Sequence, residues 1–207
     1  MFESKNTEMP HVKHLSKDRR LKKAISKTGP VKLRKQNNVF MSLCGAIMSQ
    51  QLSTRVAQVI HKRFLTLFDG QEPLPEQVLN LPHETLRGIG LSNAKSTYVQ
   101  NVARFAIEKG MTISKLEKMS NDEVIEYLTE IKGVGRWTVE MLLMFTLGRE
   151  DVFAVDDLGI QQAIISLYEI KQKDRKKIKK KMLAISETWA PYRTYACIYL
   201  WRWKDVQ

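Results

Sequence analysis

LTEIKGVGRWTVEMLLMF, from Leu128 to Phe145, is the stretch that decides the fold of this chain. It predicts one helix, a tight reversal and a second helix that begins at once. Two glycines in the reversal allow backbone conformations that a Cβ would block, and they let N–H groups at the start of the second helix approach a phosphate. Val134 is predicted to turn inward, while Lys132 and Arg136 add positive charge. The alternative interpretation is an ordinary glycine-capped corner between two helices.

The rest of the chain has helical periodicity almost throughout. Apolar residues repeat at helical spacing from Val39 to Ile47, and Ser120 with Glu123 has the spacing of a capping box. A second Gly-x-Gly corner at Gly88–Gly90 has fewer flanking charges, so we interpret it as a structural turn. Only DVFAV (151–155) looks extended. Further helices are predicted over residues 91–110, 138–147, 158–170, 173–190 and 191–203. The sequence therefore predicts an all-α fold of about ten helices.

Composition narrows the class of partner. The 207 residues include 34 Lys and Arg against 22 Asp and Glu, a net charge of +12, and 43% are hydrophobic. That hydrophobic content is enough to build a core, so wholesale disorder is excluded. The positive charge favours a polyanionic partner, with nucleic acid first and an acidic membrane second.

Cysteine and histidine usage excludes several kinds of site. Two cysteines, Cys44 and Cys197, are too few for a disulfide framework, a four-cysteine zinc site or a four-cysteine iron–sulfur cluster. The four histidines form no HxxxH or HExxH pattern, so we predict no catalytic metal. Apolar runs are far shorter than the roughly 20 residues of a membrane helix, and residues 1–13 lack an apolar leader. We therefore expect a soluble, intracellular protein with no membrane partner.

Four motifs in order resemble the helix–hairpin–helix DNA glycosylase superfamily, in which the hairpin is followed by a Gly/Pro-rich loop and a catalytic Asp. The sequence is similar to the bacterial AlkA-type 3-methyladenine DNA glycosylases, and the similarity covers residues 14–203. The motifs are AIMSQQLS (46–53), GVGRWTVEMLLMF (133–145), DVFAVDDLGI (151–160) and WAPYRTYACIYLW (189–201). Three departures stand out: the chain is too short for an N-terminal β-rich domain, Val155 replaces a frequent Pro, and Met141 replaces an aromatic residue.

The resemblance implies two helical lobes with a DNA-binding cleft and a helix–hairpin–helix motif. In this arrangement an N-terminal arm (1–36) packs on the C-terminal lobe. Residues 37–130 form a central helical bundle. Residues 131–207 contain the helix–hairpin–helix, the loop with the catalytic Asp and the C-terminal helices.

The resemblance also implies an activity. It is hydrolysis of the N-glycosidic bond of alkylated purines, 3-methyladenine and 7-methylguanine first, in double-stranded damaged DNA, by a monomer that acts in base excision repair. Trp137 stands where backbone-cleaving branches have a Schiff-base lysine, which implies a monofunctional enzyme that leaves an abasic site. We expect it in the cytoplasm or nucleoid of a prokaryote, or in a eukaryotic nucleus. Alternatives are a glycosylase for hypoxanthine or ethenoadenine, which a softer pocket at Met141 permits, and a non-catalytic DNA-binding protein.

Two adjacent carboxylates are candidates for the chemistry. A single carboxylate can stabilise the oxocarbenium-like sugar and also orient the attacking water. AlkA-type spacing counted from Trp137 selects Asp157 as the catalytic residue, with Asp156 as a helix cap. The pattern of the endonuclease III branch selects Asp156, our second choice. The alternative interpretation is that this Asp pair only caps the helix that begins at Leu158.

Aromatic residues are candidates for the base pocket. The indoles of Trp137 and Trp201 attract a cationic base by stacking and cation–π contact, and Met141 completes the predicted pocket. The alternative is that both tryptophans are ordinary core residues.

The remaining predicted contacts are with the DNA backbone and the flipped-base gap. In the family a side chain of the 49–53 loop fills the space that the flipped base leaves, and Gln51 and Leu52 match it here; the alternative is an ordinary polar loop. Hairpin residues predicted to contact DNA are Lys132, Gly133, Val134, Gly135 and Arg136. We expect no cofactor other than a monovalent cation on the hairpin carbonyls. The basic runs at 17–23 and 171–181 are either solvated helix faces or a source of long-range attraction to DNA.

Overall fold

The structure is a computed structural model that describes residues 9–206. Over these residues the chain forms thirteen helices and no strand, which confirms the predicted all-α class. The chain divides into two compact units: residues 35–147, here the central unit, and residues up to 34 with residues 148 onward, here the terminal unit. Most of the polar N-terminal stretch for which no apolar leader is expected lies outside the described residues.

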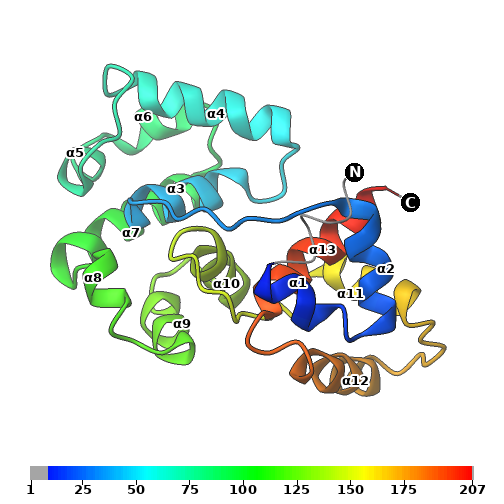
Figure 1. Cartoon of the computed structure of the whole chain (residues 1–207). Coiled ribbons are helices and arrows are strands. Elements are labelled where there is room, and N and C mark those ends of the chain that lie inside the picture. The colour runs from blue at the N-terminus through cyan, green and yellow to red at the C-terminus, as the bar shows by residue number, and fades with distance from the viewer. Residues whose placement is uncertain (1–8, 207) are drawn as a thin grey trace. The chain divides into compact units, whose positions relative to one another are not determined.

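The central unit is built around one long helix, α7. This helix packs against α3, α5 and α6 (Figure 1). Fully buried side chains from four helices form the core, among them Leu43, Phe64, Val99 and Leu128. The helices of the unit are α3 (Val39–Ser49), α4 (Thr54–Thr66), α5 (Pro75–Leu79), α6 (His83–Gly88), α7 (Asn93–Glu108), α8 (Ile113–Leu116), α9 (Asn121–Thr129) and α10 (Arg136–Phe145).

Local sequence signals set several of these boundaries. Ser92 accepts a hydrogen bond from the Lys95 amide at the start of α7. Ser120 and Glu123 form the predicted capping box at the start of α9, with the side chain of each accepting from the backbone of the other. Such caps satisfy amides that a helix leaves without an internal partner. Gly90, at a φ of +108°, makes the predicted structural turn between α6 and α7.

The hairpin helices belong to the central unit, although we expected residues 131–147 to group with the C-terminal helices. Helix α10 packs against α9 and α3, and it buries Val139, Leu142 and Leu143. A backbone hydrogen bond from Gln36 to the carbonyl of Thr146 joins the two ends of the unit. The apolar face of α10 therefore decides where the hairpin packs.

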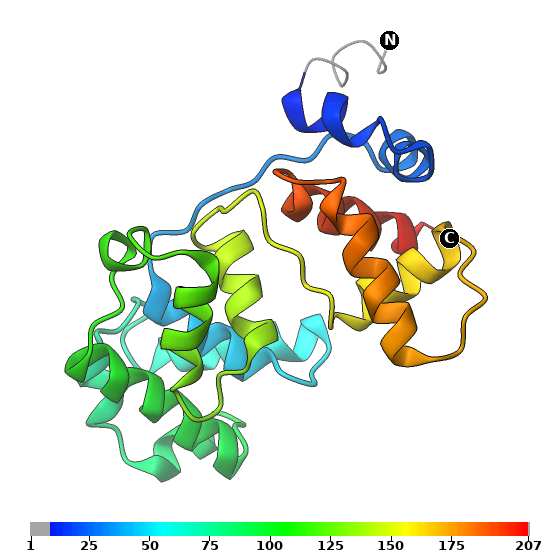
Figure 2. The ribbon, with the colours of Figure 1, turned by 90° about the horizontal axis from the view of Figure 1, so that it is seen from below.

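The terminal unit is organised around α13. Helices α2 and α11 both pack against α13, and Trp189 and Tyr199 are among its fully buried side chains. In Figure 1 α12 lies at the lower edge of this unit, and Figure 2, which looks from below, shows it in orange in front of α13 in red. The helices are α1 (Pro10–Leu15), α2 (Arg19–Thr28), α11 (Leu158–Leu167), α12 (Arg175–Glu187) and α13 (Arg193–Asp205).

The start of α2 is fixed by a part-buried hydrogen-bond network. Oδ1 of Asp18 caps the helix by accepting from the amides of Arg20 and Leu21. Oδ2 accepts from the hydroxyl of Tyr168 and from the indole N–H of Trp189. Burial by itself raises the pKa of Asp18, but these hydrogen bonds outweigh it and hold the pKa below its usual value. This carboxylate joins three parts of the unit.

The first helix is anchored by aromatic contact. The imidazole of His11 stacks on the ring of Tyr195, with 3.9 Å between centroids and an interplanar angle of 8°. Burial lowers the pKa of His11, and the charge of Glu150 opposes that effect. The neutral ring is therefore the form that the packing favours.

Several expectations differ from the structure in detail. The helix count exceeds ten because α1, α5, α6 and α8 are short helices of four to six residues. The DVFAV segment forms no strand ladder; instead the amide of Val152 donates to the hydroxyl of Thr194. Among the described residues, no helix has the length and apolar character needed to cross a membrane.

Candidate active site

The two hairpin glycines have different environments. Gly133 has a φ of +106°, and a Cβ there would lie 2.2 Å from Cγ of Tyr98. Only glycine fits this position. Gly135 has an extended φ of −97° and open space around a Cβ, so the prediction that it needs a glycine-specific conformation is wrong. Gly135 is the N-cap of α10, and it has no side chain to occupy the first-turn amides.

Side-chain amides from elsewhere in the central unit hold the hairpin. Nδ2 of Asn101 donates to the carbonyl of Lys132 at 3.1 Å, and Nε2 of Gln50 donates to the carbonyl of Gly133 at 3.4 Å. Val134 is buried, as predicted, so only its backbone can reach a ligand. A cation on these carbonyls would have to share them with the two amides. The fold of the hairpin therefore rests on contacts within the protein.

The two cations of the hairpin also differ. Nε of Arg136 lies 3.0 Å from Oε1 of Glu140, which is almost fully buried, and its Nη2 lies 3.8 Å from Asp122. The charge of Arg136 is thus shared with carboxylates, a pairing that the sequence analysis did not foresee. Lys132 is exposed at the turn and is the hairpin cation that remains available to a phosphate.

The loop that carries Gln51 and Leu52 joins α3 to α4. Gln51 is exposed in a left-handed conformation with a φ of +56°, and Leu52 is 37% exposed. Nζ of Lys95 donates to the carbonyls of Met48 and Gln50, at 3.0 and 2.6 Å. Partial burial lowers the pKa of Lys95. Because Gln50 also reaches the hairpin, the structure brings the predicted gap-filling loop and the hairpin together.

Helix α10 presents the two central-unit candidates for the base pocket. Trp137 is 43% exposed, which rules out the core interpretation for this side chain. Met141 follows four residues later and is half-buried. Residues four apart lie on one face of a helix, so the indole and the thioether are neighbours on the surface of α10.

In the terminal unit Asp157 is the N-cap of α11. Its Oδ1 accepts from the amide of Ile160 at 2.8 Å and from the indole N–H of Trp201, also at 2.8 Å. A Cβ on Gly159 would lie 3.1 Å from that same Oδ1 and 3.1 Å from Cδ1 of Trp201. The carboxylate is therefore oriented by two donors and packed against a glycine that leaves room for the indole.

Asp156 has a different role from the one predicted. It is exposed, and Nζ of Lys179 lies 2.6 and 2.8 Å from its two oxygens. The expectation that Asp156 caps the helix is wrong, because Asp157 makes the capping bond. Capping and the predicted catalytic role thus fall on one residue, at a position where the helix dipole favours negative charge.

Sequence reasoning missed the partners of the candidate residues. The bond between Trp201 and Asp157 joins residues 44 apart, and Lys179 lies 23 residues from Asp156. No local pattern indicates either pair. The spacing from Asp157 to Ile160 is typical of an N-cap and is the one signal in the sequence for the orientation of this carboxylate.

Comparison with known proteins identifies the family. The family model described as "HhH-GPD superfamily base excision DNA repair protein" matches residues 44–188. The chain belongs to this superfamily. DNA-3-methyladenine glycosylase 1 of Schizosaccharomyces pombe is 38% identical over 188 residues, which cover 89% of this chain and 80% of that protein.

Solved structures of glycosylases named for 3-methyladenine agree with this match. DNA-3-methyladenine glycosidase of Bacillus halodurans is 38% identical with a TM-score of 0.84, over 96% of this chain and 91% of that one. Mag1 of Schizosaccharomyces pombe, solved in complex with abasic DNA, is 36% identical with a TM-score of 0.81, over 94% and 96% of the two chains. As a member of the HhH-GPD superfamily, the protein binds DNA.

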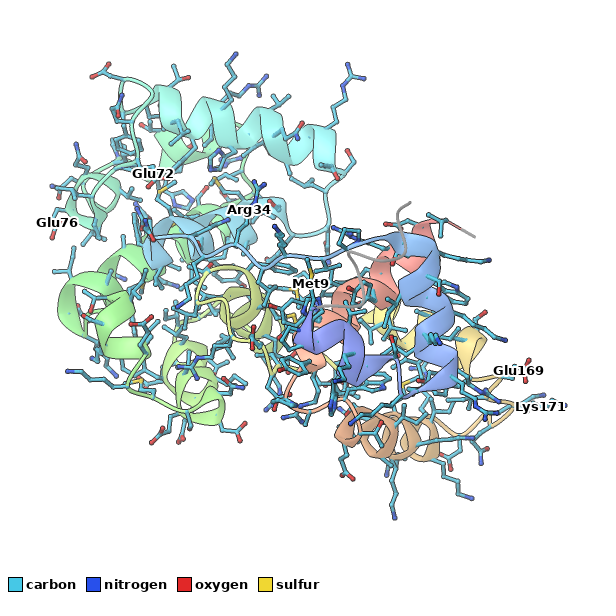
Figure 3. All side chains as sticks on the ribbon, viewed as in Figure 1. Met9, Arg34, Glu72, Glu76, Glu169 and Lys171 are labelled. Atoms are coloured by element: carbon cyan, nitrogen blue, oxygen red, sulfur yellow. The ribbon has the colours of Figure 1, made fainter. Side chains whose placement is uncertain are left out.

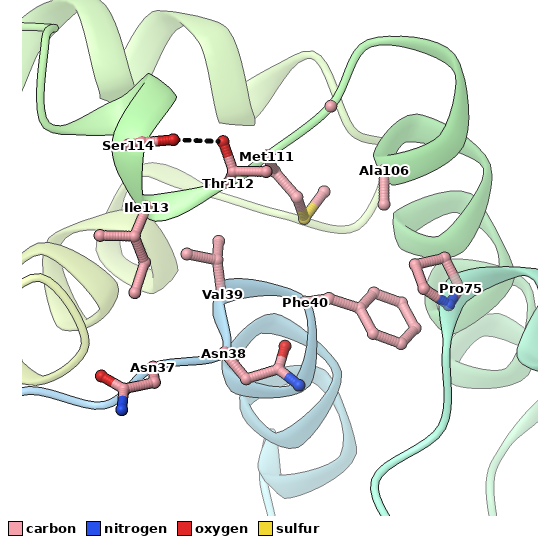
Figure 4. Close-up of a pocket in the computed structure, with 11 residues that line it drawn as sticks. Asn37, Asn38, Val39, Phe40, Pro75, Ala106, Met111, Thr112, Ile113 and Ser114 are labelled. Carbon is pink, nitrogen blue, oxygen red and sulfur yellow. Dashed lines mark hydrogen bonds between the residues drawn. The ribbon is translucent and has the colours of Figure 1, made fainter.

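A separate cavity of about 440 Å³ lies in the central unit of this HhH-GPD protein. Val39, Phe40 and Pro75 line one part of it, and Thr112 and Ser114 hydrogen-bond to each other at another (Figure 4). None of the described residues that line it is a predicted site residue. The described residues also contain no group of three or more His, Cys, Asp or Glu side chains that could hold a metal ion.

Proposed function

We propose that this protein is a monofunctional DNA glycosylase that removes alkylated purines, 3-methyladenine and 7-methylguanine first, from double-stranded DNA. The observation that carries the proposal is the carboxylate of Asp157, fixed at the start of α11 by the amide of Ile160 and the indole of Trp201. Relatives that share 38% of the sequence and are named for 3-methyladenine support the choice of lesion.

The carboxylate acts on the sugar and on water. As the glycosidic bond breaks, positive charge develops on the sugar, and a carboxylate held in place stabilises it without reorganising. The same group orients or deprotonates the water that attacks from the side opposite the leaving base. An alkylated purine already carries positive charge, so it leaves without a strong general acid. One carboxylate therefore suffices for this reaction.

Aromatic and apolar side chains select the base. Trp137 and Met141 on α10, and Trp201 beside Asp157, are the proposed contacts. An indole face attracts a cationic base by about 0.5–2 kcal/mol more than a neutral one. Trp201 has a second task, because its N–H group also holds the carboxylate.

The hairpin and the neighbouring loop hold the DNA. First-turn amides of α10, which Gly135 leaves uncovered, and the ammonium of Lys132 bind phosphates of the backbone. Gln51 and Leu52 fill the space that the flipped base leaves. The protein acts on DNA as a monomer in this proposal, as its resemblance to the family implies.

The chemistry stops at the abasic site. Cleavage of the DNA backbone by a Schiff-base mechanism needs an amine that attacks the sugar. The position that supplies this amine in backbone-cleaving relatives is occupied by Trp137, whose indole cannot form a Schiff base.

Base release from duplex DNA that contains single defined lesions tests the proposal. We expect release of 3-methyladenine and 7-methylguanine, and strand breaks only after treatment with alkali. Strand breaks before alkali would contradict the monofunctional mechanism. Release of hypoxanthine or ethenoadenine alone would move the specificity to those lesions, and binding without any release would replace the enzyme with a DNA-binding protein.

A further inference from the structure

The beginning of α12 carries the densest positive charge in the chain. Residues 171–181 contain eight Lys and Arg side chains and one acidic residue, Asp174. All eight cations are exposed, and Lys171 is labelled on the turn before the helix (Figure 3). The cations are Lys171, Lys173, Arg175, Lys176, Lys177, Lys179, Lys180 and Lys181.

This charge works against the stability of the helix. The first turn of α12 has no acidic residue, and cations near a helix N-terminus oppose the helix dipole. Lys176 and Lys180, like Lys177 and Lys181, stand four residues apart, where like charges repel. The cap of Asp174 and the burial of Met182 hold the helix in place. A polyanion bound along these side chains would offset the repulsion.

The ion pair of Lys179 joins this helix to the candidate catalytic loop. Nζ of Lys179 bonds both oxygens of Asp156, the residue before Asp157. The basic helix and the Asp157 carboxylate therefore belong to one connected part of the terminal unit. A polyanion that reaches Asp157 has α12 beside it.

We propose that the outward face of α12, formed by Lys176, Lys177, Lys180 and Lys181, binds phosphates of duplex DNA outside the lesion and holds undamaged DNA without sequence preference. The proposal rests on the proposed function only in that DNA is the polyanion. A membrane fits this face less well, because a helix that binds lipid presents an apolar face to it. On α12 Met182 is buried, and Leu183, 42% exposed, is a single large apolar side chain rather than a continuous apolar face.

Salt dependence on undamaged DNA tests the proposal. The affinity of the full chain for an undamaged duplex of about 30 base pairs is measured against salt for the wild type and for Lys176→Gln/Lys180→Gln. Each lost phosphate contact lowers the slope of log K against log salt by about 0.9, so the slope falls by about 2. If the lines meet near 1 M salt, affinity at 0.1 M falls about 60-fold.

A matched pair on α2 is the control. Lys22→Gln/Lys23→Gln removes the same charge from two exposed residues of the same unit, and its slope should change by less than about 0.5. An equal fall in this control would show that overall charge, and not α12, carries the effect. An unchanged slope in the α12 variant would overturn the proposal. Binding of both proteins to phosphatidylserine vesicles is also measured. If the α12 variant loses vesicle binding but keeps its DNA affinity, the proposal is also overturned.

Two further measurements separate DNA binding by α12 from a loss of helix stability and from the proposed glycosylase function. Without DNA, the α12 variant should unfold at the same or a higher temperature than the wild type, since the substitutions relieve repulsion. A lower unfolding temperature would contradict the account of α12. The binding assay uses undamaged DNA, so failure of the wild type to release any base would overturn the proposed function and leave the salt result standing.

Discussion

Two aspartates in the terminal unit make the same two kinds of hydrogen bond in different surroundings. Asp18 caps α2 and Asp157 caps α11, and each carboxylate also accepts a hydrogen bond from a tryptophan indole, Trp189 for the first and Trp201 for the second. At Asp18 both oxygens bond to donors of the protein. At Asp157 the cap and the indole both bond to Oδ1.

The difference lies in what surrounds the carboxylate. Asp18 joins three segments, and Trp189 beside it is fully buried. Asp157 is followed by Leu158, which is 71% exposed, and by a glycine against which the half-buried Trp201 packs. A capping aspartate that bonds an indole is therefore no sign of catalysis by itself. At Asp18 this pair of hydrogen bonds stabilises the fold, and at Asp157 we propose that it also orients a catalytic carboxylate.

The two hairpin glycines also differ in their surroundings, and replacing Gly133 should have the largest effect on stability. Gly133→Ala should lower the free energy of unfolding by about 3 kcal/mol, because a Cβ collides with Tyr98 at a positive φ. Gly135→Ala should cost less than about 1 kcal/mol and weaken DNA binding. Urea unfolding and a DNA titration measure both variants. Equal losses of stability would contradict the different environments of the two glycines.

Gly159→Ala tests the packing at Asp157. The added Cβ meets Oδ1 of Asp157 and the ring of Trp201 at 3.1 Å, so it pushes the carboxylate and the indole apart. We expect base release to slow about 10- to 100-fold, because a misplacement of about 1 Å at a reacting group can cost about 100-fold. Single-turnover kinetics measure it, and a wild-type rate would show that the glycine has no role in orienting Asp157.

Replacing each tryptophan with phenylalanine tests whether the indole bond to Asp157 affects base release while the one to Asp18 affects only stability. Trp201→Phe keeps a ring and removes the N–H donor to Asp157, and base release should slow about tenfold. Trp189→Phe should leave the rate of release unchanged and lower stability, because this indole is fully buried against Asp18. The comparison fails if Trp189→Phe slows release as much as Trp201→Phe does.

Asp18→Asn should show the smallest effect, and that effect depends on pH. The folded-state pKa of Asp18 is lowered, so its stabilisation is complete above the unfolded value, near 3.9, and is lost as the pH falls through the folded value. At neutral pH the variant should be about 1 kcal/mol less stable than the wild type, a modest figure because solvent reaches this site. Unfolding at pH 7 and pH 3 measures the difference, which should shrink at the lower pH. An equal stability difference at both pH values would show that the ionised carboxylate of Asp18 is not the source of the stabilisation.

The sequence predicts those parts of this molecule that depend on near neighbours. The capping box of Ser120, the turn at Gly133 and the all-α class follow from spacing and from backbone freedom. The assignment of Gly135 was wrong because a glycine in an extended conformation cannot be told from sequence. The sequence also could not show which compact unit contains the hairpin, because the packing of α10 on α3 decides this.

The partners of the site residues depend on tertiary contacts and could not be predicted. Lys95 reaches the carbonyl of Met48 across 47 positions, and Trp201 reaches Asp157 across 44. Asp156 and Asp157 are adjacent in the sequence, and only the fold shows that one forms an ion pair with Lys179 and the other caps a helix. Spacing from Trp137 selected Asp157, but it could not indicate the ion pair of Asp156 or the indole donor to Asp157.

Single-turnover release of 3-methyladenine from duplex DNA by Asp157→Asn, with Asp156→Asn and Asp18→Asn as controls, tests the central claim most directly. Asparagine at position 157 can still accept from Ile160 and Trp201, so the fold and the DNA affinity should survive. The account predicts release at least about 10³-fold slower for Asp157→Asn and within about fivefold of the wild type for both controls. Wild-type release by Asp157→Asn, or loss in Asp156→Asn alone, would contradict it.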